Sequence, residues 1–290
     1  MRSDSSMHAP TRITLPQTRR GAAPAAVGAR ARWSLLAGQC LVLGGLLAGC
    51  GGEAAESPAS AGDPAQGSAP ASAPAEPLGT ATVTGTVRFD GEPPRGRPIV
   101  MGADPKCEAK HDAPVVDQAV LVGDDGGLGN VLVRVLWTGG PVGAPSEPKV
   151  LDQNGCLYTP RVVGVQTGQT LEILNSDELL HNVHSTSTTN PAFNRAMPAA
   201  ITETKVTFEQ PEDAFLVKCD VHPWMASYVA VLDHPFHAVS GADGSFEIGG
   251  LPAGTYQVEA WHERFGSQTT TVTVEEGGAA TADFTFAPGT

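Results

Sequence analysis

Positive charge is scarce in this chain. It holds 18 Lys and Arg residues against 31 Asp and Glu residues, which gives a formal net charge of −13 at pH 7. Proteins that bind nucleic acid present a basic face to the phosphates, so the composition argues against that class. The acidic balance suits an exported domain that meets a basic patch on a partner, although charge alone does not name the partner.

A long apolar run is also missing. The nearest candidate, residues 35–47, follows two arginines and is interrupted by glycine and a glutamine. It is too short to span a bilayer comfortably, so we interpret it as part of a secretion signal. Its end, Leu47-Ala48-Gly49-Cys50, resembles the lipobox of bacterial lipoproteins. That resemblance implies removal of residues 1–49 and a lipid on Cys50; a plain secretory signal and a transmembrane helix are the alternatives.

The next segment, residues 50–79, has few bulky side chains and consists mainly of Gly, Ala, Ser, Pro and Glu. It cannot bury enough apolar surface to offset its chain entropy. We expect a disordered tether with an r.m.s. reach of roughly 30 Å. A lipid on Cys50 would make the membrane a partner and place the protein in the cell envelope, on the periplasmic or outer-membrane face.

Helical periodicity is nearly absent from the rest of the chain. Short runs rich in β-branched residues recur instead, separated by turn signals such as Asp90-Gly91 and Asp243-Gly244. The expected strands are residues 80–89, 130–137, 161–165, 170–174, 203–208, 214–218, 227–232, 245–248, 255–261, 268–274 and 281–286. This pattern predicts an all-β fold of one or two sandwiches.

Cysteine is scarce, with five in the chain. Cys40 would leave with the signal and Cys50 would carry the lipid. Of the remaining three, Cys107 and Cys156 lie in turns and predict a disulfide, as expected in an oxidising compartment. Cys219 is then left as a free thiol.

The free thiol belongs to the most informative stretch, Cys219-Asp220-Val221-His222-Pro223-Trp224-Met225. It supplies a thiolate, an imidazole and a thioether, and His181 or His184 upstream can supply a second imidazole. One cysteine, two histidines and a weak methionine are the ligands of a mononuclear blue-copper centre. Spacing alone does not decide between His181 and His184.

The loop resembles the Cys-x-x-His-Pro-aromatic-Met ligand loop of amicyanin-type cupredoxins, a group akin to plastocyanin. The run from Asn175 to His181-Asn182-Val183-His184 resembles their first-ligand segment. The resemblance covers residues 149–235 and implies a Greek-key cupredoxin sandwich. It implies that His181, Cys219, His222 and Met225 hold one type 1 copper, with His181 in the loop after the strand at residues 170–174.

The same resemblance implies a role for three neighbours of the ligands. Asn182 would tie the two ligand loops together by hydrogen bonds. The edge of His222, exposed and flanked by Trp224, would be the port for electrons. Val221 stands where the family often has proline, so we expect its N–H to point at the thiolate sulfur, and Val221→Pro to lower the midpoint potential.

Residues 236–290 resemble the carboxypeptidase regulatory-like sandwich, a transthyretin-type and carbohydrate-binding-like fold. The likeness lies in Asp243-Gly244-Ser245-Phe246 and Leu251-Pro252-Ala253-Gly254-Thr255-Tyr256. Residues 85–94 resemble the start of the same sandwich. We therefore expect a split sandwich with residues 80–148 as its first part; tandem order is the alternative. The order of motifs along the whole chain resembles exported proteins commonly called methylamine utilisation proteins.

These features predict a membrane-tethered blue-copper protein that carries single electrons between redox partners and is not an enzyme. One alternative is a glycan- or protein-binding module with structural or stored copper, although only Tyr256 and Trp261 offer an aromatic surface for sugar. A copper enzyme is a further alternative. A second metal site is a weaker possibility; its candidate ligands are His184, His234, His237, His262 and Glu263.

Overall fold

A computed structural model describes residues 77–289. The predicted signal, Cys50 and most of the tether lie outside these residues. Within them, no helix is long and apolar enough to cross a membrane.

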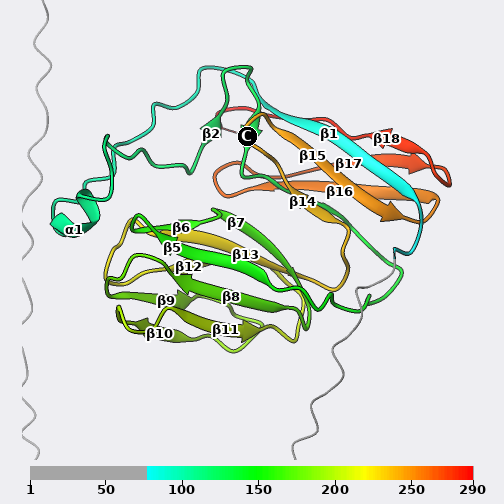
Figure 1. Cartoon of the computed structure of the whole chain (residues 1–290). Coiled ribbons are helices and arrows are strands. Elements are labelled where there is room, and N and C mark those ends of the chain that lie inside the picture. Colours follow the sequence, from blue (N-terminus) through cyan, green and yellow to red (C-terminus); the bar gives the residue numbers. More distant parts are fainter. Residues whose placement is uncertain (1–76, 290) are drawn as a thin grey trace, which may run out of the picture. The chain divides into compact units, whose positions relative to one another are not determined.

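The middle of the described chain forms a sandwich of two sheets (Figure 1), with strand orders β10-β9-β12-β13-β7 and β11-β8-β5-β6. The strands are β5 (Lys149–Asn154), β6 (Leu157–Thr159), β7 (Val162–Gln166), β8 (Thr170–Asn175), β9 (His181–Ser185), β10 (Asn194–Met197), β11 (Glu203–Thr207), β12 (Glu212–Lys218) and β13 (Ala226–Leu232). Alternate residues of β8 point inward, among them Leu171 and Ile173, as a half-buried strand requires. This is the predicted cupredoxin-like sandwich.

The second sandwich takes strands from both sides of the first. Its sheets have the orders β15-β1-β18, with β19 also paired to β1, and β14-β4-β16-β17. The strands are β1 (Ala81–Phe89), β4 (Leu132–Val135), β14 (His237–Val239), β15 (Ser245–Leu251), β16 (Gly254–His262), β17 (Gly266–Val274), β18 (Ala279–Thr281) and β19 (Phe284–Phe286), and a small hairpin adds β2 (Leu121–Val122) and β3 (Leu128–Gly129). Because β1 and β4 pair with C-terminal strands, the sandwich is split around the cupredoxin rather than placed after it.

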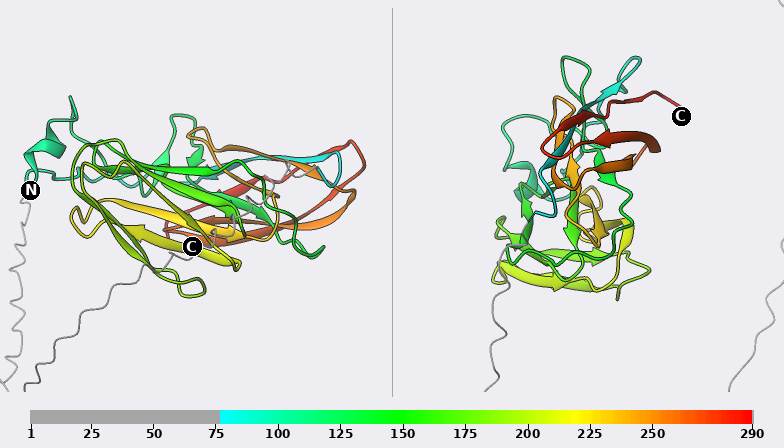
Figure 2. Two further views of the ribbon diagram at one scale, coloured as in Figure 1. Left: turned by 60° about the horizontal axis from the view of Figure 1, so that its bottom comes forward. Right: turned by 90° about the vertical axis from the view of Figure 1, so that its right-hand side faces the viewer.

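The two sandwiches share an apolar contact between the sheets of β4 and β13. The fully or nearly buried residues there are Leu132, Val162, Ala230 and Leu232. Arg161 closes one side with two hydrogen bonds to Glu263, at 2.7 and 2.8 Å, and Arg134 contacts Asp213 at 2.7 Å. Figure 2 shows the sheets as separate layers.

Residues 99–115, called the cap below, leave the second sandwich. Ile99 donates its N–H to Val115 O at 2.8 Å and so closes the base of the cap. The tip carries the short helix α1 (Pro105–Glu108), whose N-cap is Asp104. In Figure 1 the loop reaches from the β1 side to the ends of β5 and β6.

The cap packs on the cupredoxin. Met101 and Cys107 are buried in its core cluster, and Cys107 forms a disulfide with Cys156. Gly155 and Cys156 connect β5 and β6 with φ values of 63° and 54°, the left-handed pair of a tight hairpin turn. Residues 99–115 were predicted to belong to the second sandwich, but they pack on the first.

Most of the predicted strands are present, but three predictions were wrong. His181 was expected in a loop and is the first residue of β9, a strand whose buried polar side chains hide the usual apolar alternation. The strand expected at residues 281–286 is two strands, separated where Asp283 Oδ1 accepts the Thr86 N–H at 2.9 Å. The turn expected at Cys107 is a short helix, α1 (Pro105–Glu108).

Glu212 offers a test of loop stability. Its carboxylate accepts hydrogen bonds from Ser187, Thr188, Thr189 and Asn190. Burial raises the pKa of Glu212, but these bonds outweigh burial and lower it to about 2. Since hydrogen bonds to a charged group are worth about 1.5–3 kcal/mol, Glu212→Gln is expected to lower the free energy of unfolding by about 2 kcal/mol at pH 7.

Urea unfolding measures the effect. A depressed pKa means that the contribution is complete above the ordinary value of 4.5 and is lost as the pH falls toward 2, so the difference between variant and wild type should shrink by pH 3. Exposed Glu209 provides the control variant Glu209→Gln. Equal losses for the two variants would contradict the assignment.

Candidate metal centre

The predicted ligands meet at one end of the cupredoxin sandwich. His181 begins β9, and Cys219 directly follows β12. His222 and Met225 come from the loop between β12 and β13, which is closed by hydrogen bonds from Met225 N to His222 O and from Cys219 N to Met225 O. All four side chains are nearly or fully buried, with exposed fractions of 0–2%.

Three of the four present ligand atoms to one another. The Nδ1 atoms of His181 and His222 lie 2.9 Å apart, and the sulfur of Cys219 lies 3.9 Å from His222 Nδ1. His181, Cys219 and His222 form one of three groups of potential metal ligands among residues 77–289. Met225 is buried in the same core cluster as Cys219.

The outer nitrogens of both imidazoles face carboxylates. His181 Nε2 lies 2.9 Å from Asp177 Oδ2, and His222 Nε2 lies 3.2 Å from Asp104 Oδ2. An ionised carboxylate only accepts hydrogen bonds, so both Nε2 atoms carry hydrogen. Two neutral rings would then direct their Nδ1 lone pairs at each other, and a cation, either a proton or a metal ion, is needed between them.

The pKa shifts agree with this electrostatic picture. Burial lowers the pKa of His181, but its hydrogen bonds to Asp177 and Cys219 raise it overall to about 9. Burial raises the pKa of Cys219, while hydrogen bonds from His181 and from backbone amides lower it below its ordinary value. A protonated imidazole therefore lies beside a thiol that ionises readily. A soft divalent or monovalent metal ion can take the place of the protons on these two side chains.

Asn182 joins the two ligand segments as predicted. Its Oδ1 accepts the N–H groups of Asp220 at 2.7 Å and Val221 at 3.3 Å, and it lies 3.4 Å from the sulfur of Cys219. Its backbone carbonyl accepts a hydrogen bond from the Tyr158 hydroxyl at 2.7 Å. The ligand loop is thereby fixed to β9.

Val221 does not play the role expected for it. The N–H that donates to the Cys219 sulfur, at 3.4 Å, is that of His222. The Val221 N–H donates to Asn182 Oδ1 at 3.3 Å, and its interaction with the thiol is the smallest of the backbone contributions that lower the pKa of Cys219. The prediction that Val221→Pro lowers the midpoint potential therefore rests on this small contribution alone.

The expected exposed port at His222 was wrong. His222 is 2% exposed, because the cap covers its outer edge with Asp104 and with Cys107, whose sulfur lies 3.5 Å from Nε2. Trp224 packs against His222 with ring centres 5.1 Å apart and donates Nε1–H to Cys156 O at 3.0 Å. Spacing within residues 149–235 could not reveal a cover contributed by another segment.

Asp177 was not singled out from the sequence. Its side chain is fully buried and accepts from Gly155 N and Cys156 N, both at 2.7 Å, in addition to His181. Lys110 of the cap lies 3.1 Å away. Its position four residues before a predicted ligand was the available signal.

The remaining histidines do not form a second centre in the described part of the chain. His184 pairs with Asp220 at 2.9 Å, and His234 Nδ1 accepts the Phe236 N–H. His237 lies against Gly164, where a β-carbon would overlap its ring. His262 stacks on Phe265, and its neighbour Glu263 binds Arg161; none of these histidines is in a ligand group within residues 77–289.

The sheets and the site define an all-β protein in which a cupredoxin-like sandwich interrupts a second sandwich. A family model described as a carboxypeptidase regulatory-like domain matches residues 226–287, so that likeness begins in β13, before the predicted start at residue 236. A comparison with curated proteins gives no match.

Solved structures similar to part of the chain include a copper-containing nitrite reductase from Thermus scotoductus SA-01, with 20% identity and a TM-score of 0.28. A Cu(I) amicyanin variant has 22% identity and a TM-score of 0.27, and a purple cupredoxin from Nitrosopumilus maritimus has 20% and 0.25. These alignments cover 35%, 34% and 29% of this chain. They span 26% of the reductase chain, 97% of the amicyanin chain and 98% of the purple cupredoxin chain.

Proposed function

We propose that the protein binds one copper ion in a type 1 centre and carries single electrons. The observation that carries the proposal is the convergence of two Nδ1 atoms and one thiol, with both Nε2 atoms turned toward carboxylates. A thiolate and two imidazoles suit copper, and a buried thioether suits its weak axial position. Bound copper would supply a reversible one-electron couple.

The protein's own residues would keep that couple rigid and dry. Asn182 and Tyr158 fix the relative positions of β9 and the Cys219 loop. All four ligand side chains are buried, and Cys219 and Met225 belong to the core cluster, so the site is shielded from bulk water. This arrangement supports electron transfer to a protein partner rather than an enzymatic reaction.

Attachment to the membrane through Cys50 and a location in the cell envelope complete the proposal. They rest on the lipobox-like sequence alone. A lipid anchor followed by a tether would let the copper domain reorient toward its redox partner.

The alternative of a sugar-binding module has less support from the contacts of its aromatic candidates. Trp261 packs against Tyr228 with ring centres 5.3 Å apart, at the contact between the sandwiches. Tyr256 stacks on Trp137 and donates its hydroxyl hydrogen to Pro252 O at 2.9 Å. Both rings are engaged within the protein.

Copper loading tests the proposal. The Cu(II) form should be intensely coloured, with a strong sulfur-to-copper band and a narrow copper hyperfine splitting in its EPR spectrum. Cys219→Ser should remove the band, and His184→Gln should retain it because His184 faces Asp220. A colourless Cu(II) protein, or a band that survives in Cys219→Ser, would rule out the type 1 centre.

A further inference from the structure

The cap contacts His222 through Asp104, and this contact indicates a role for the cap at the predicted metal centre. Asp104 lies in a different segment of the chain from every predicted ligand, yet its carboxylate reaches the only outer nitrogen that His222 has. We propose that Asp104 is the positioning residue for His222, and that the cap holds the Asp104 carboxylate beside His222 Nε2. This inference rests on the proposed copper function, and it names a part of the centre contributed from outside the cupredoxin.

The two carboxylate oxygens of Asp104 have separate tasks. Oδ1 accepts the Lys106 N–H at 3.0 Å and caps α1. Oδ2 lies 3.2 Å from His222 Nε2. One oxygen therefore fixes Asp104 on the helix, while the other fixes the imidazole with Nε2–H outward and the Nδ1 lone pair inward, as a metal ligand requires.

The tip of the cap is attached to the cupredoxin at several points, so Asp104 is held in place. Cys107 is joined to Cys156, Lys110 contacts Asp177 at 3.1 Å, and His111 Nε2 lies 2.7 Å from Gly155 O. These partners lie in the β5–β6 turn or beside the first ligand. The cap thus joins both ligand histidines to one rigid hairpin.

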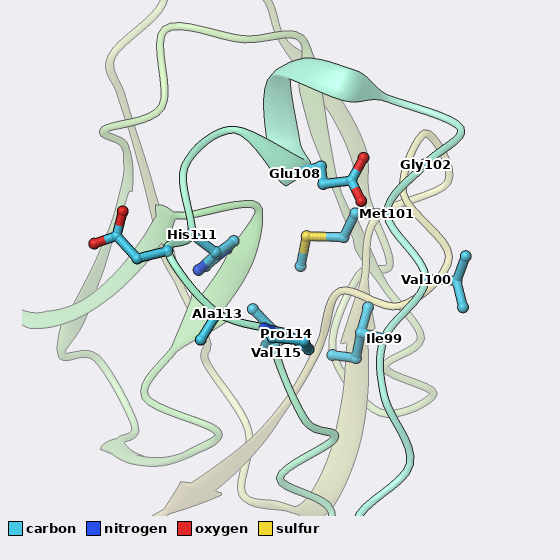
Figure 3. Close-up of a pocket in the computed structure, with 10 residues that line it drawn as sticks. Ile99, Val100, Met101, Gly102, Glu108, His111, Ala113, Pro114 and Val115 are labelled. Atoms are coloured by element: carbon cyan, nitrogen blue, oxygen red, sulfur yellow. The ribbon is translucent and has the colours of Figure 1, made fainter.

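The inside of the cap is not filled. An open hollow of about 400 Å³ lies between its two limbs, lined by Ile99, Val100, Met101, Glu108, His111 and Pro114 among others (Figure 3). The cap is held against the first sandwich by the contacts at its tip, Asp104 included, and by apolar packing of Met101, together with Ile99 and Val115, in the core cluster.

Asp104→Asn is the cleanest test. Asparagine is an equally good N-cap, so its single oxygen can keep the bond from Lys106. Its NH₂ group then faces His222 Nε2, and a donor replaces the acceptor. The variant should move His222 toward the Nδ1–H tautomer and lower copper affinity about tenfold or more, the usual cost of losing a partner of a metal-ligating histidine.

Two measurements follow. Long-range ¹H–¹⁵N NMR of the metal-free protein reports the His222 tautomer, and titration with copper against a competing chelator reports affinity. Asp112→Asn is the matched control, since Asp112 is an exposed carboxylate of the same cap that lines the hollow rather than facing His222. It should leave both readouts at wild-type values.

A wild-type tautomer in Asp104→Asn together with affinity within about twofold of the control would overturn the inference. A comparable affinity loss in Asp112→Asn would also overturn it, because the effect would then be one of net charge. If the wild-type protein lacks the sulfur-to-copper band, the proposed function fails separately, and the tautomer in the metal-free protein still decides the role of Asp104.

Discussion

Replacing Asp177 by alanine is expected to lower the free energy of unfolding by about 3 kcal/mol or more and copper affinity by about 10–100-fold. The carboxylate is fully buried and accepts from four donors: Gly155 N, Cys156 N, Lys110 Nζ and His181 Nε2. Although burial raises its pKa, the bond from His181 and the other donors hold the pKa of Asp177 below its ordinary value. The Asp177→Ala variant lacks the carboxylate that joins the β5–β6 turn, the cap and His181.

Asp177→Asn should be nearly as harmful, since one amide oxygen cannot replace two and the NH₂ group would face N–H donors. Urea unfolding of the metal-free protein and chelator competition with copper give the two values. Glu178→Gln is the control: the neighbouring carboxylate is exposed and should tolerate the change. Stability of Asp177→Ala within about 0.5 kcal/mol of wild type, the range of ordinary surface substitutions, would contradict the role assigned here.

The second large effect is expected from the disulfide. Cys107→Ser with Cys156→Ser should lower the free energy of unfolding by about 4 kcal/mol, the chain-entropy value for a cross-link with a sequence separation of 49 residues. The loss should also loosen the cap, whose limbs enclose an open hollow. Amide hydrogen exchange should then accelerate in residues 99–115 more than in the distant strands β16 and β17.

Wild-type protein treated with a thiol reductant provides an independent comparison and should approach the double variant in both measurements. Cys219→Ser is a useful control because it removes a thiol without touching the cross-link. Unchanged exchange in the cap of the double variant would mean that Asp104, Lys110 and His111 hold it without the disulfide.

The sequence predicted much of the fold because short β-branched runs and glycine turns are local signals. The exceptions have a common physical cause. Strand β9 begins with the polar residues His181 and Asn182, which are buried through specific hydrogen bonds rather than through apolar alternation. A pattern based on hydrophobic periodicity cannot detect such a strand.

The site shows the same division. The residue types and spacing from Cys219 to Met225 were enough to predict that Cys219 and His222 lie together in one tight loop, and the resemblance of the upstream segment was needed to select His181. The partners of their outer edges could not be predicted: Asp104 lies 118 residues before His222, and only the tertiary fold brings it there. The exposed port was inferred from the loop alone and was wrong for that reason.

The split sandwich limits how the cupredoxin-like domain can be moved between proteins. The cap and one half of the disulfide precede β4, and the rest of the ligand end follows it. Cutting out residues 149–235 would separate His222 from Asp104 and leave Cys156 without its partner. A fragment of residues 149–235 would therefore lack two contacts of the ligand end, the carboxylate beside His222 and the cross-link to the β5–β6 turn.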